Sequence, residues 1–355
     1  MEKSLLQKIK ILSILLLSGL GLSVLASGRG GRGDALMRAP MGAYATSLGG
    51  AATARPAFGD AWWNPAYSAS RQANHLSAGV ARKSLDRGEH FLAYDGAVSQ
   101  SPFGYSVLFR HSGFLGLDSL RDDQGEILES GDNYSLMLMG GLSFRVQDDL
   151  FLGVSTGWRY NTLPTDFHGT EIEQRTSSGF GGISLFAMYT GLSNLTVSGG
   201  VRELFLDQSW SSDDATAIYF AIEDTALTPF TVSLQHDPVF SAEALSFSYD
   251  VDVYLFSHGF QRLDHPFLMA NMGVEWGANE VVQLRAGVMD ILLDGFVLNP
   301  DEEVLSEKYR PLFTGGFGVQ TDSIIDFYSM VLNYSLRGSS VGAGFDHAVD
   351  FVFQF

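Results

Sequence analysis

Most of the chain alternates with a period of two between apolar residues and polar or small ones. In one stretch an apolar set alternates with a small or charged set: Leu152, Val154, Thr156, Trp158 and Tyr160 against Gly153, Ser155, Gly157 and Arg159. Residues 245–253, 282–288 and 328–335 repeat the pattern. Side chains of a strand point alternately to two faces, so a strand with one apolar face gives this period. The pattern predicts an antiparallel all-β protein and leaves a soluble sandwich and a membrane barrel both open.

The alternation recurs often enough to predict fourteen strands, most of them separated by clear interruptions of the pattern. Their expected ranges are 74–83, 88–99, 102–112, 132–147, 149–161, 176–191, 194–203, 228–236, 244–258, 268–277, 280–290, 311–321, 325–337 and 343–355.

The lengths of the intervening segments distinguish the two architectures. With a periplasmic N-terminus, the periplasmic turns are very short except for 237–243: 100–101, 148, 192–193, 278–279 and 322–324. The segments on the other side are long, polar and acidic: 113–131, 162–175, 204–227, 259–267 and 291–310. This asymmetry and an even strand number are typical of outer-membrane barrels. We therefore expect a transmembrane antiparallel β-barrel over residues 74–355.

The C-terminal strand agrees with that architecture. Phe351, Phe353 and Phe355 share one face, and Phe355 is the last residue of the sequence. An aromatic final strand resembles the terminal signal by which outer-membrane barrels are recognised for insertion. The alternative is an ordinary closing strand with Phe-rich packing.

The N-terminus has the layout of a secretory signal peptide. Lys3, Lys8 and Lys10 precede an uncharged apolar run over residues 11–26 that ends in small residues. The run is shorter than the ~20 residues that a transmembrane helix needs, which disfavours a membrane anchor. We expect residues 1–26 to be cleaved and the protein to be located in a bacterial outer membrane, in contact with its lipid.

Composition narrows the functional classes. There is no cysteine, which excludes disulfide scaffolds and thiol catalysis. The formal net charge of −18 disfavours a nucleic-acid binder, which needs a basic face. An Asp-His pair like Asp346 and His347 occurs in outer-membrane proteases, but those are smaller barrels with further acidic residues in the site. We expect a non-enzymatic protein with no cofactor.

Residues 27–73 precede the first strand and lack a strand pattern. The stretch 42–54 consists mainly of small residues, and Trp62 and Trp63 are followed by Asn64 and Pro65. Small residues allow close backbone packing, and Asn-Pro favours a turn. A fourteen-stranded barrel is wider than the eight-stranded ones that side chains fill. We expect residues 27–73 to occupy its lumen as a plug.

Short motifs in this segment and near the C-terminus resemble those of the PorV/PorQ family, a branch of the FadL-like outer-membrane barrels. They are a Gly-Gly-Ala stretch, an Asp and Asn-Pro-Ala ahead of the first strand, then 284–287, 315–318 and a strand containing Asn333 and Tyr334. The chain departs from the family at Val288, where a Tyr is common. The resemblance implies a fourteen-stranded barrel whose N-terminal plug is shaped by Gly49, Gly50, Asp60, Asn64, Pro65 and Ala66.

Several charged residues fall on the predicted lumen face. A charge on the lipid face costs about 2–4 kcal/mol for Arg at the midplane, so the inward direction is favoured. The residues are Arg159, Arg202, Asp250, Asp252, Glu275 and Arg285, together with Arg110, Arg145, Arg337 and Asp95. Either they pair with one another and with the plug, or they form a polar conduit or a latch that gates the plug.

Two functions follow from the resemblance. PorV/PorQ relatives serve type IX secretion as partners of the translocon and of exported proteins, and the acidic outer loops would provide the contact surface. FadL itself transports hydrophobic small molecules, which requires an apolar pocket in the lumen. Because the predicted lumen is rich in Arg and Asp, the sequence favours the protein-binding role, with the transporter as the alternative.

Overall fold

The structure is a computed structural model that describes residues 24–25, 40–83, 87–114, 134–168, 171–204, 210–212, 227–236, 244–257, 261–279, 281–293, 311–325, 328–338 and 345–355. The first half of the barrel contains β2 (His75–Arg82), β3 (Arg87–Ala97), β4 (Phe103–Phe114), β5 (Tyr134–Gln147), β6 (Leu150–His168), β7 (Glu171–Leu192) and β8 (Leu195–Leu204). The second half contains β10 (Leu227–His236), β11 (Ala244–Ser257), β12 (Gln261–Gly277), β13 (Val282–Leu292), β14 (Leu312–Ile325), β15 (Tyr328–Gly338) and β16 (Phe345–Gln354).

Fourteen strands within the described residues, β2–β8 and β10–β16, form a closed antiparallel barrel. Each pairs with its neighbour in sequence, and β16 returns to pair with β2. The barrel closes without a free edge, which a membrane-spanning sheet requires because lipid cannot satisfy its backbone groups. The fold class and the strand number predicted from the alternation are confirmed.

Two short strands lie outside this ring. β1 (Val24–Leu25) pairs in parallel with the start of β12, and β9 (Trp210–Ser212) pairs with β7. β1 falls within the predicted signal peptide, whose cleavage stays a prediction.

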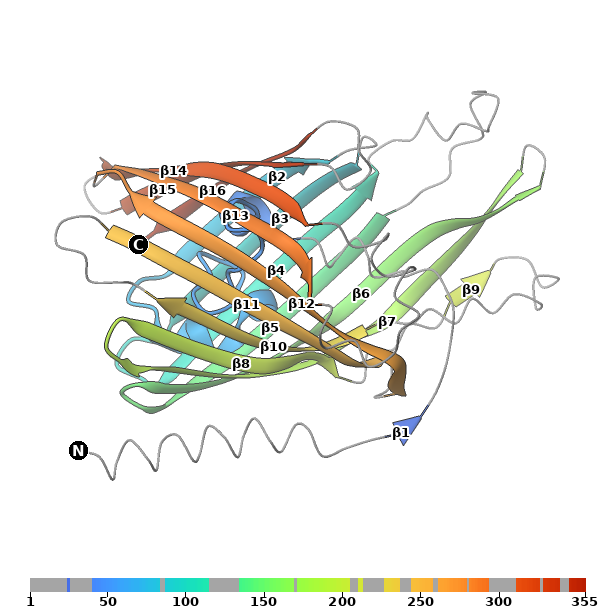
Figure 1. The fold of residues 1–355 in the computed structure, drawn as a ribbon, viewed down its shortest axis with the longest axis horizontal. Helices are drawn as coiled ribbons and strands as arrows, with labels where there is room; N and C mark the ends of the chain where they lie inside the picture. The colour runs from blue at the N-terminus through green and yellow to red at the C-terminus, as the bar shows by residue number, and fades with distance from the viewer. Residues whose placement is uncertain are drawn as a thin grey trace.

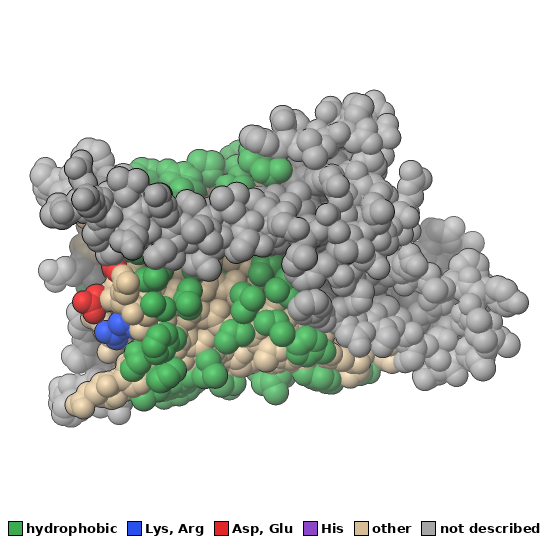
Figure 2. Space-filling model, turned by 90° about the horizontal axis from the view of Figure 1, so that it is seen from below, with side chains coloured by type: hydrophobic (Ala, Val, Ile, Leu, Met, Phe, Trp, Pro, Cys, Tyr) green, Lys and Arg blue, Asp and Glu red, His purple; other side chains and the backbone are tan. Residues whose placement is uncertain are grey.

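The outward face of the barrel is apolar. Val107 and Leu138 are each about half exposed, at 50% and 51%, although they lie in the middle of long strands. The described part of the surface shown in Figure 2 is covered by hydrophobic side chains between small and polar ones, with charged side chains gathered at one end. A soluble protein rarely exposes so broad an apolar band, whereas a lipid bilayer solvates it. The exterior is therefore suited to a membrane.

Aromatic side chains mark both ends of this apolar band. At the end with the short turns, the rings of Phe103 and Phe144 lie 5.2 Å apart and those of Tyr94 and Tyr105 lie 5.6 Å apart. At the other end, neighbouring rings 5.8–5.9 Å apart connect His90, His111, Tyr134 and Tyr160 across four strands. Such girdles sit at the two membrane interfaces of outer-membrane barrels. Among the described residues, no helix is both long and apolar enough to span a membrane.

Tight turns at the end of the barrel with the short connections contain residues with a positive φ. Asn194, between β7 and β8, has a φ of 61°, and Gln100, between β3 and β4, has a φ of 58°. After β12, the Asn279 side chain accepts hydrogen bonds from the backbone of Val281 and Val282. Asn adopts such conformations at low cost, which explains why the chain reverses there within two or three residues.

The strands on the opposite side are longer than the sequence predicts. β6 and β7 continue to pair as far as His168 and Glu171, so most of the expected loop 162–175 is a two-stranded ribbon. β12 likewise begins at Gln261, inside the expected loop 259–267. Those loop predictions were wrong because these stretches are rich in polar residues and do not continue in the sequence the regular apolar–polar alternation of the strands that they extend. The extension of β7 also provides the edge on which β9 pairs.

Residues 40–73, called the N-terminal segment below, lie inside the barrel. They contain α3 (Gly42–Ser47), α4 (Asp60–Trp63) and the 3-10 helix η1 (Pro65–Ser70), and almost all are buried. α3 packs against β13–β16, whereas α4 and η1 pack against β4–β6 on the other side. Figure 1 shows these blue helices enclosed by the strands. The barrel and the segment therefore share one core.

The depth of the apolar band can be measured with arginine substitutions. Val107→Arg, at mid-strand on the outward face, should destabilise the barrel by about 2–4 kcal/mol, and Phe103→Arg, at the aromatic end, by about 0–1 kcal/mol. Urea titrations of the barrel in lipid vesicles give both values. Equal costs at the two positions would contradict the assignment of this face to lipid.

Candidate functional site

Carboxylates of the barrel wall bind the helix N-termini of the N-terminal segment. α3 has no capping side chain of its own, because its N-cap residue is Met41. Asp350 of β16 takes that role, accepting hydrogen bonds from the backbone N–H groups of Ala43 at 2.5 Å and Tyr44 at 3.1 Å. Helix N-termini carry unpaired donors and a partial positive charge, so a carboxylate is well suited to them.

The same arrangement recurs at α4. Its N-cap is Gly59, which has a φ of 67° and no side chain to offer. Asp95 of β3 accepts hydrogen bonds from the backbone of Gly59 at 2.7 Å and of Asp60 at 3.0 Å, and the hydroxyl of Ser106 holds the same carboxylate. Two strands that flank β2, β16 and β3, thus supply the caps for two helices of the segment.

Asp60 joins the start of α4 to the C-terminal end of the N-terminal segment. Its carboxylate accepts hydrogen bonds from Arg71 at 2.5 and 2.7 Å and from the Ser68 hydroxyl at 2.9 Å. Burial disfavours the charged form of Arg71, but Asp60 holds the pKa of that guanidinium above its ordinary value. The pair is buried and mutually neutralised, so it closes the segment into a compact loop before β2.

Asn64 fixes the turn between α4 and η1. Its side-chain oxygen accepts a hydrogen bond from Ala66 N–H and thereby caps η1, whose first residue is Pro65. Its amide nitrogen donates to the Thr53 carbonyl at 3.0 Å and to Ser198 of β8 at 2.9 Å. Asn64 is fully buried, and the polar atoms of its side chain are satisfied by this set. An Asn-Pro pair therefore both begins a helix and attaches it to the wall.

Glycines allow the N-terminal segment and the wall to approach closely. Gly49 has a φ of 66°, and a Cβ there would lie 2.6 Å from the Val288 carbonyl. Gly50 has a φ of 84°, which also favours glycine. On the wall, a Cβ at Gly153 would collide with the backbone nitrogen of Ala66, and one at Gly287 with that of Gly49. At Gly49, Gly50, Gly153 and Gly287, together called the glycine seam below, the backbone of the segment lies against the wall.

Arg285 connects the wall and α3. It bonds Glu275 at 2.5 Å and the Asn333 side chain at 2.8 Å, and its guanidinium lies 4.6 Å from the centre of the Tyr44 ring. Asn333 in turn donates to Asp350 at 2.6 Å. Burial, together with nearby Glu275, raises the pKa of the Tyr44 hydroxyl above its ordinary value, so the phenol stays neutral. One network therefore links four wall residues to the helix.

Arg159 and Arg202 face the tryptophans of α4. Arg202 donates to the Thr53 hydroxyl and the Trp63 carbonyl, both at 2.9 Å, and both guanidiniums lie 5.8 Å from the centre of the Trp62 ring. Asp250 accepts a hydrogen bond from Thr53 N–H at 3.1 Å. These wall charges are all turned toward the N-terminal segment.

Glu203, which pairs with Arg159, was missed from the sequence. Strict alternation sends Arg202 inward and Glu203 outward, yet both are buried. The reason is a bulge: the β7–β8 register shifts between Ile183 and Leu185, and Glu203 has a φ of 60°. A bulge puts two successive side chains on one face. The Gly181-Gly182 pair opposite was the available signal, since adjacent glycines in a strand often mark such sites.

The lumen also holds an apolar cluster formed between the segment and the wall. Trp62, Trp63 and Phe58 of the segment pack with Met137 and Met139 of β5, among other buried residues. The Phe58 ring stacks on Phe91 of β3 with centroids 4.6 Å apart. The described lumen is therefore apolar in places as well as charged.

Some residues predicted to face the lumen or to form the acidic loops do not take part in these contacts. Asp252 lies in β11, but its side chain is outside the described residues, as are the acidic loop residues 118–129 and 301–307. Arg145, expected in the lumen, is exposed at the end of β5.

Comparison with solved structures identifies the fold. The chain superposes on the toluene transporter TbuX of Ralstonia pickettii with a TM-score of 0.50 and 12% identity, over 88% of this chain and 97% of that one. The monoaromatic hydrocarbon channel CymD gives 0.53 and 11%, over 88% and 96%. A TodX deltaS2S3 mutant gives 0.53 and 12%, over 88% and 98%.

These similarities show a FadL-like fourteen-strand barrel, as the resemblance implied. They do not distinguish the PorV/PorQ branch. No protein-family model matches the chain, and no curated protein matches its sequence.

The glycine seam predicts a sharp steric difference between two glycines of neighbouring strands. Gly153→Val should displace η1, because its side chain meets Ala66, whereas Gly140→Val should be tolerated, because nothing lies within 4 Å of a Cβ there. Trypsin digestion of the folded barrel is the measurement, with cleavage after Arg55 or Arg71 reporting a displaced segment. Equal protection of the two variants would contradict the seam.

The cap on α3 predicts a graded loss of stability. Asp350→Ala leaves the N–H groups of Ala43 and Tyr44 and the amide of Asn333 unpaired in a buried site, and should cost about 1–3 kcal/mol. Asp350→Asn keeps one acceptor and should cost less. Denaturant unfolding of the two variants tests the order, and an alanine variant as stable as the wild type would refute the capping role.

Proposed function

We propose that the protein is an outer-membrane channel for small hydrophobic molecules, closed by its N-terminal segment acting as a plug. The observation that carries the proposal is the plug itself: a buried segment, held by reversible polar contacts, fills a barrel with the fold of hydrocarbon channels. The apolar exterior supports a location in the outer membrane.

The charges in the lumen do not oppose an apolar cargo. Arg71 is neutralised by Asp60, Arg159 by Glu203 and Arg285 by Glu275. The carboxylates of Asp95 and Asp350 accept hydrogen bonds from the helix N-termini of the plug. Arg202 donates to the Thr53 hydroxyl and the Trp63 carbonyl, and beside it lies the apolar surface around Trp62 and Trp63. The sequence-based argument against a transporter counted these charges without their partners.

Passage requires the plug to move, because its contacts with the wall leave little space along the glycine seam. The contacts most suited to breaking are hydrogen bonds and ion pairs, which water replaces at small net cost. The bulge at β7–β8 turns Glu203 toward Arg159, whose guanidinium lies 5.8 Å from the centre of the Trp62 ring, so the wall is irregular next to the apolar cluster. We propose that the N-terminal segment separates from the wall at this bulge when a molecule passes.

The PorV/PorQ role in type IX secretion remains the second candidate. It rests on the sequence motifs and on acidic loops whose residues lie outside the described part of the chain. The similarity to TbuX, TodX and CymD, named as a toluene transporter and monoaromatic hydrocarbon channels, supports the channel instead.

A disulfide lock tests plug movement directly. The chain has no cysteine, and a Cβ at Gly141 would lie 3.4 Å from that of Ala61, close to the separation in disulfides. The double variant Ala61→Cys/Gly141→Cys should therefore form a bond between α4 and β5. In cells lacking other FadL-like channels, toluene accumulation should fall to background when the variant is oxidised and return on reduction.

The two single-cysteine variants are the matched controls and should keep full uptake in both redox states. Uptake unchanged by the formed disulfide would refute plug movement. If the wild-type barrel admits no more toluene than cells without it, the channel function itself is wrong.

A further inference from the structure

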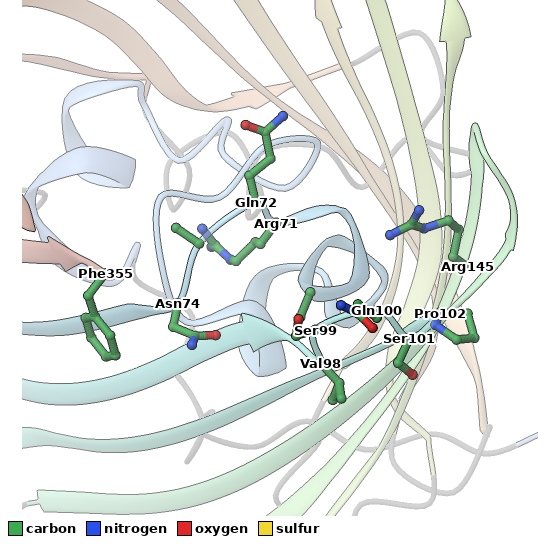
Figure 3. Close-up of a pocket in the computed structure, with 12 residues that line it drawn as sticks. Arg71, Gln72, Asn74, Val98, Ser99, Gln100, Ser101, Pro102, Arg145 and Phe355 are labelled. Atoms are coloured by element: carbon green, nitrogen blue, oxygen red, sulfur yellow. The ribbon is translucent and has the colours of Figure 1, made fainter. Parts of the chain in front are cut away.

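A cavity of about 580 Å³ opens at the end of the barrel with the short turns. Its lining comes from three parts of the chain: the end of the N-terminal segment (71–74), the β3–β4 turn with its flanking residues (97–102), and Arg145 and Phe355 on the wall. Figure 3 shows Arg145 across the cavity from Arg71 and Gln72, with Ser99 and Gln100 between them. Its volume is within the range of small-molecule sites.

The positive charge of Arg145 has no acidic side chain as a partner among the described residues that line this cavity. Arg71 is paired with Asp60, so its charge is already neutralised. Arg145 is exposed, and its guanidinium has no acidic partner within the described part of the chain. No Asp or Glu side chain lines the cavity, and the chain terminus at Phe355 lies at the far end from Arg145 (Figure 3). The Arg145 end of the cavity is therefore positive.

The remaining lining is mostly polar. The side chains of Gln72, Ser99 and Gln100 offer amide and hydroxyl groups to the same cavity as Arg145. A hydrocarbon bound there would cover these groups without pairing them, which is unfavourable. The cavity is thus less suited to bind an apolar cargo than a polar anion. A guanidinium suits oxyanions because its fork donates two parallel hydrogen bonds.

We propose that this cavity binds a small oxyanion, a carboxylate or a phosphate, with Arg145 as the charged contact. The amides of Gln72 and Gln100 complete the hydrogen bonding. Because Gln72 belongs to the link between the plug and β2, whereas Arg145 belongs to β5, the bound anion bridges the two. The site is independent of the hydrophobic cargo, and the periplasm is the compartment that supplies the anion.

Calorimetric titration of the full chain in detergent micelles tests the proposal. The probes are citrate for carboxylates and pyrophosphate for phosphates, each against sodium chloride at matched ionic strength. At least one should bind saturably at one site, and Arg145→Gln should weaken that binding about tenfold or more. The control Arg82→Gln removes an exposed arginine beyond the opposite girdle and should leave it unchanged.

A filling variant distinguishes the cavity from the surrounding surface. Ser99→Trp occupies the cavity and leaves the charge of Arg145 in place, so it should also weaken binding. Citrate binding alone assigns a carboxylate, pyrophosphate binding alone a phosphate, and both together the oxyanion class. The proposal is overturned if neither probe binds saturably, if Arg145→Gln binds like the wild type, or if Ser99→Trp does.

Discussion

The structure depends on one constraint: polar backbone groups enclosed in a membrane barrel must find partners inside it. The two α-helices of the N-terminal segment, α3 and α4, have N–H groups at their starts that no turn of the helix pairs, and neither has a capping side chain of its own. Asp350 and Asp95 of the wall supply the missing acceptors. Each carboxylate is buried at a cost that its hydrogen bonds offset, so segment and wall are stable in the lumen only together.

This pairing explains how a charged lumen would be compatible with the proposed apolar cargo. Each ion pair and each capped helix removes a charge that an isolated lumen would present to a solute. The apolar cluster of Trp62, Trp63 and the methionines of β5 remains between them. In the proposed channel, displacing the N-terminal segment would expose polar groups on both surfaces, and water would then satisfy them. The proposed closed state thus has a defined geometry, but its polar contacts can be replaced by contacts with water.

The strands were predictable because one physical rule dictates them. Lipid requires an apolar outward face, and the alternation follows this requirement closely in β2–β5. The stretches by which β6 and β7 extend beyond the predicted strands lack a regular alternation in the sequence, although they pair in the structure. The burial of Glu203 could not be predicted, because a bulge interrupts the strict inward–outward alternation of side chains that the prediction assumed. The caps were hidden for another reason: Ala43 and Asp350 are 307 residues apart, and only the closure of the barrel brings them together.

Hydrogen exchange of the wild-type barrel in lipid tests the central claim most directly. If wall carboxylates hold the helix starts, the amides of Ala43, Tyr44, Gly59 and Asp60 should exchange as slowly as strand amides in the middle of the barrel, although short helices normally fray at these positions. Exchange of these four amides at the rate of unprotected backbone, with the strands still protected, would contradict the account.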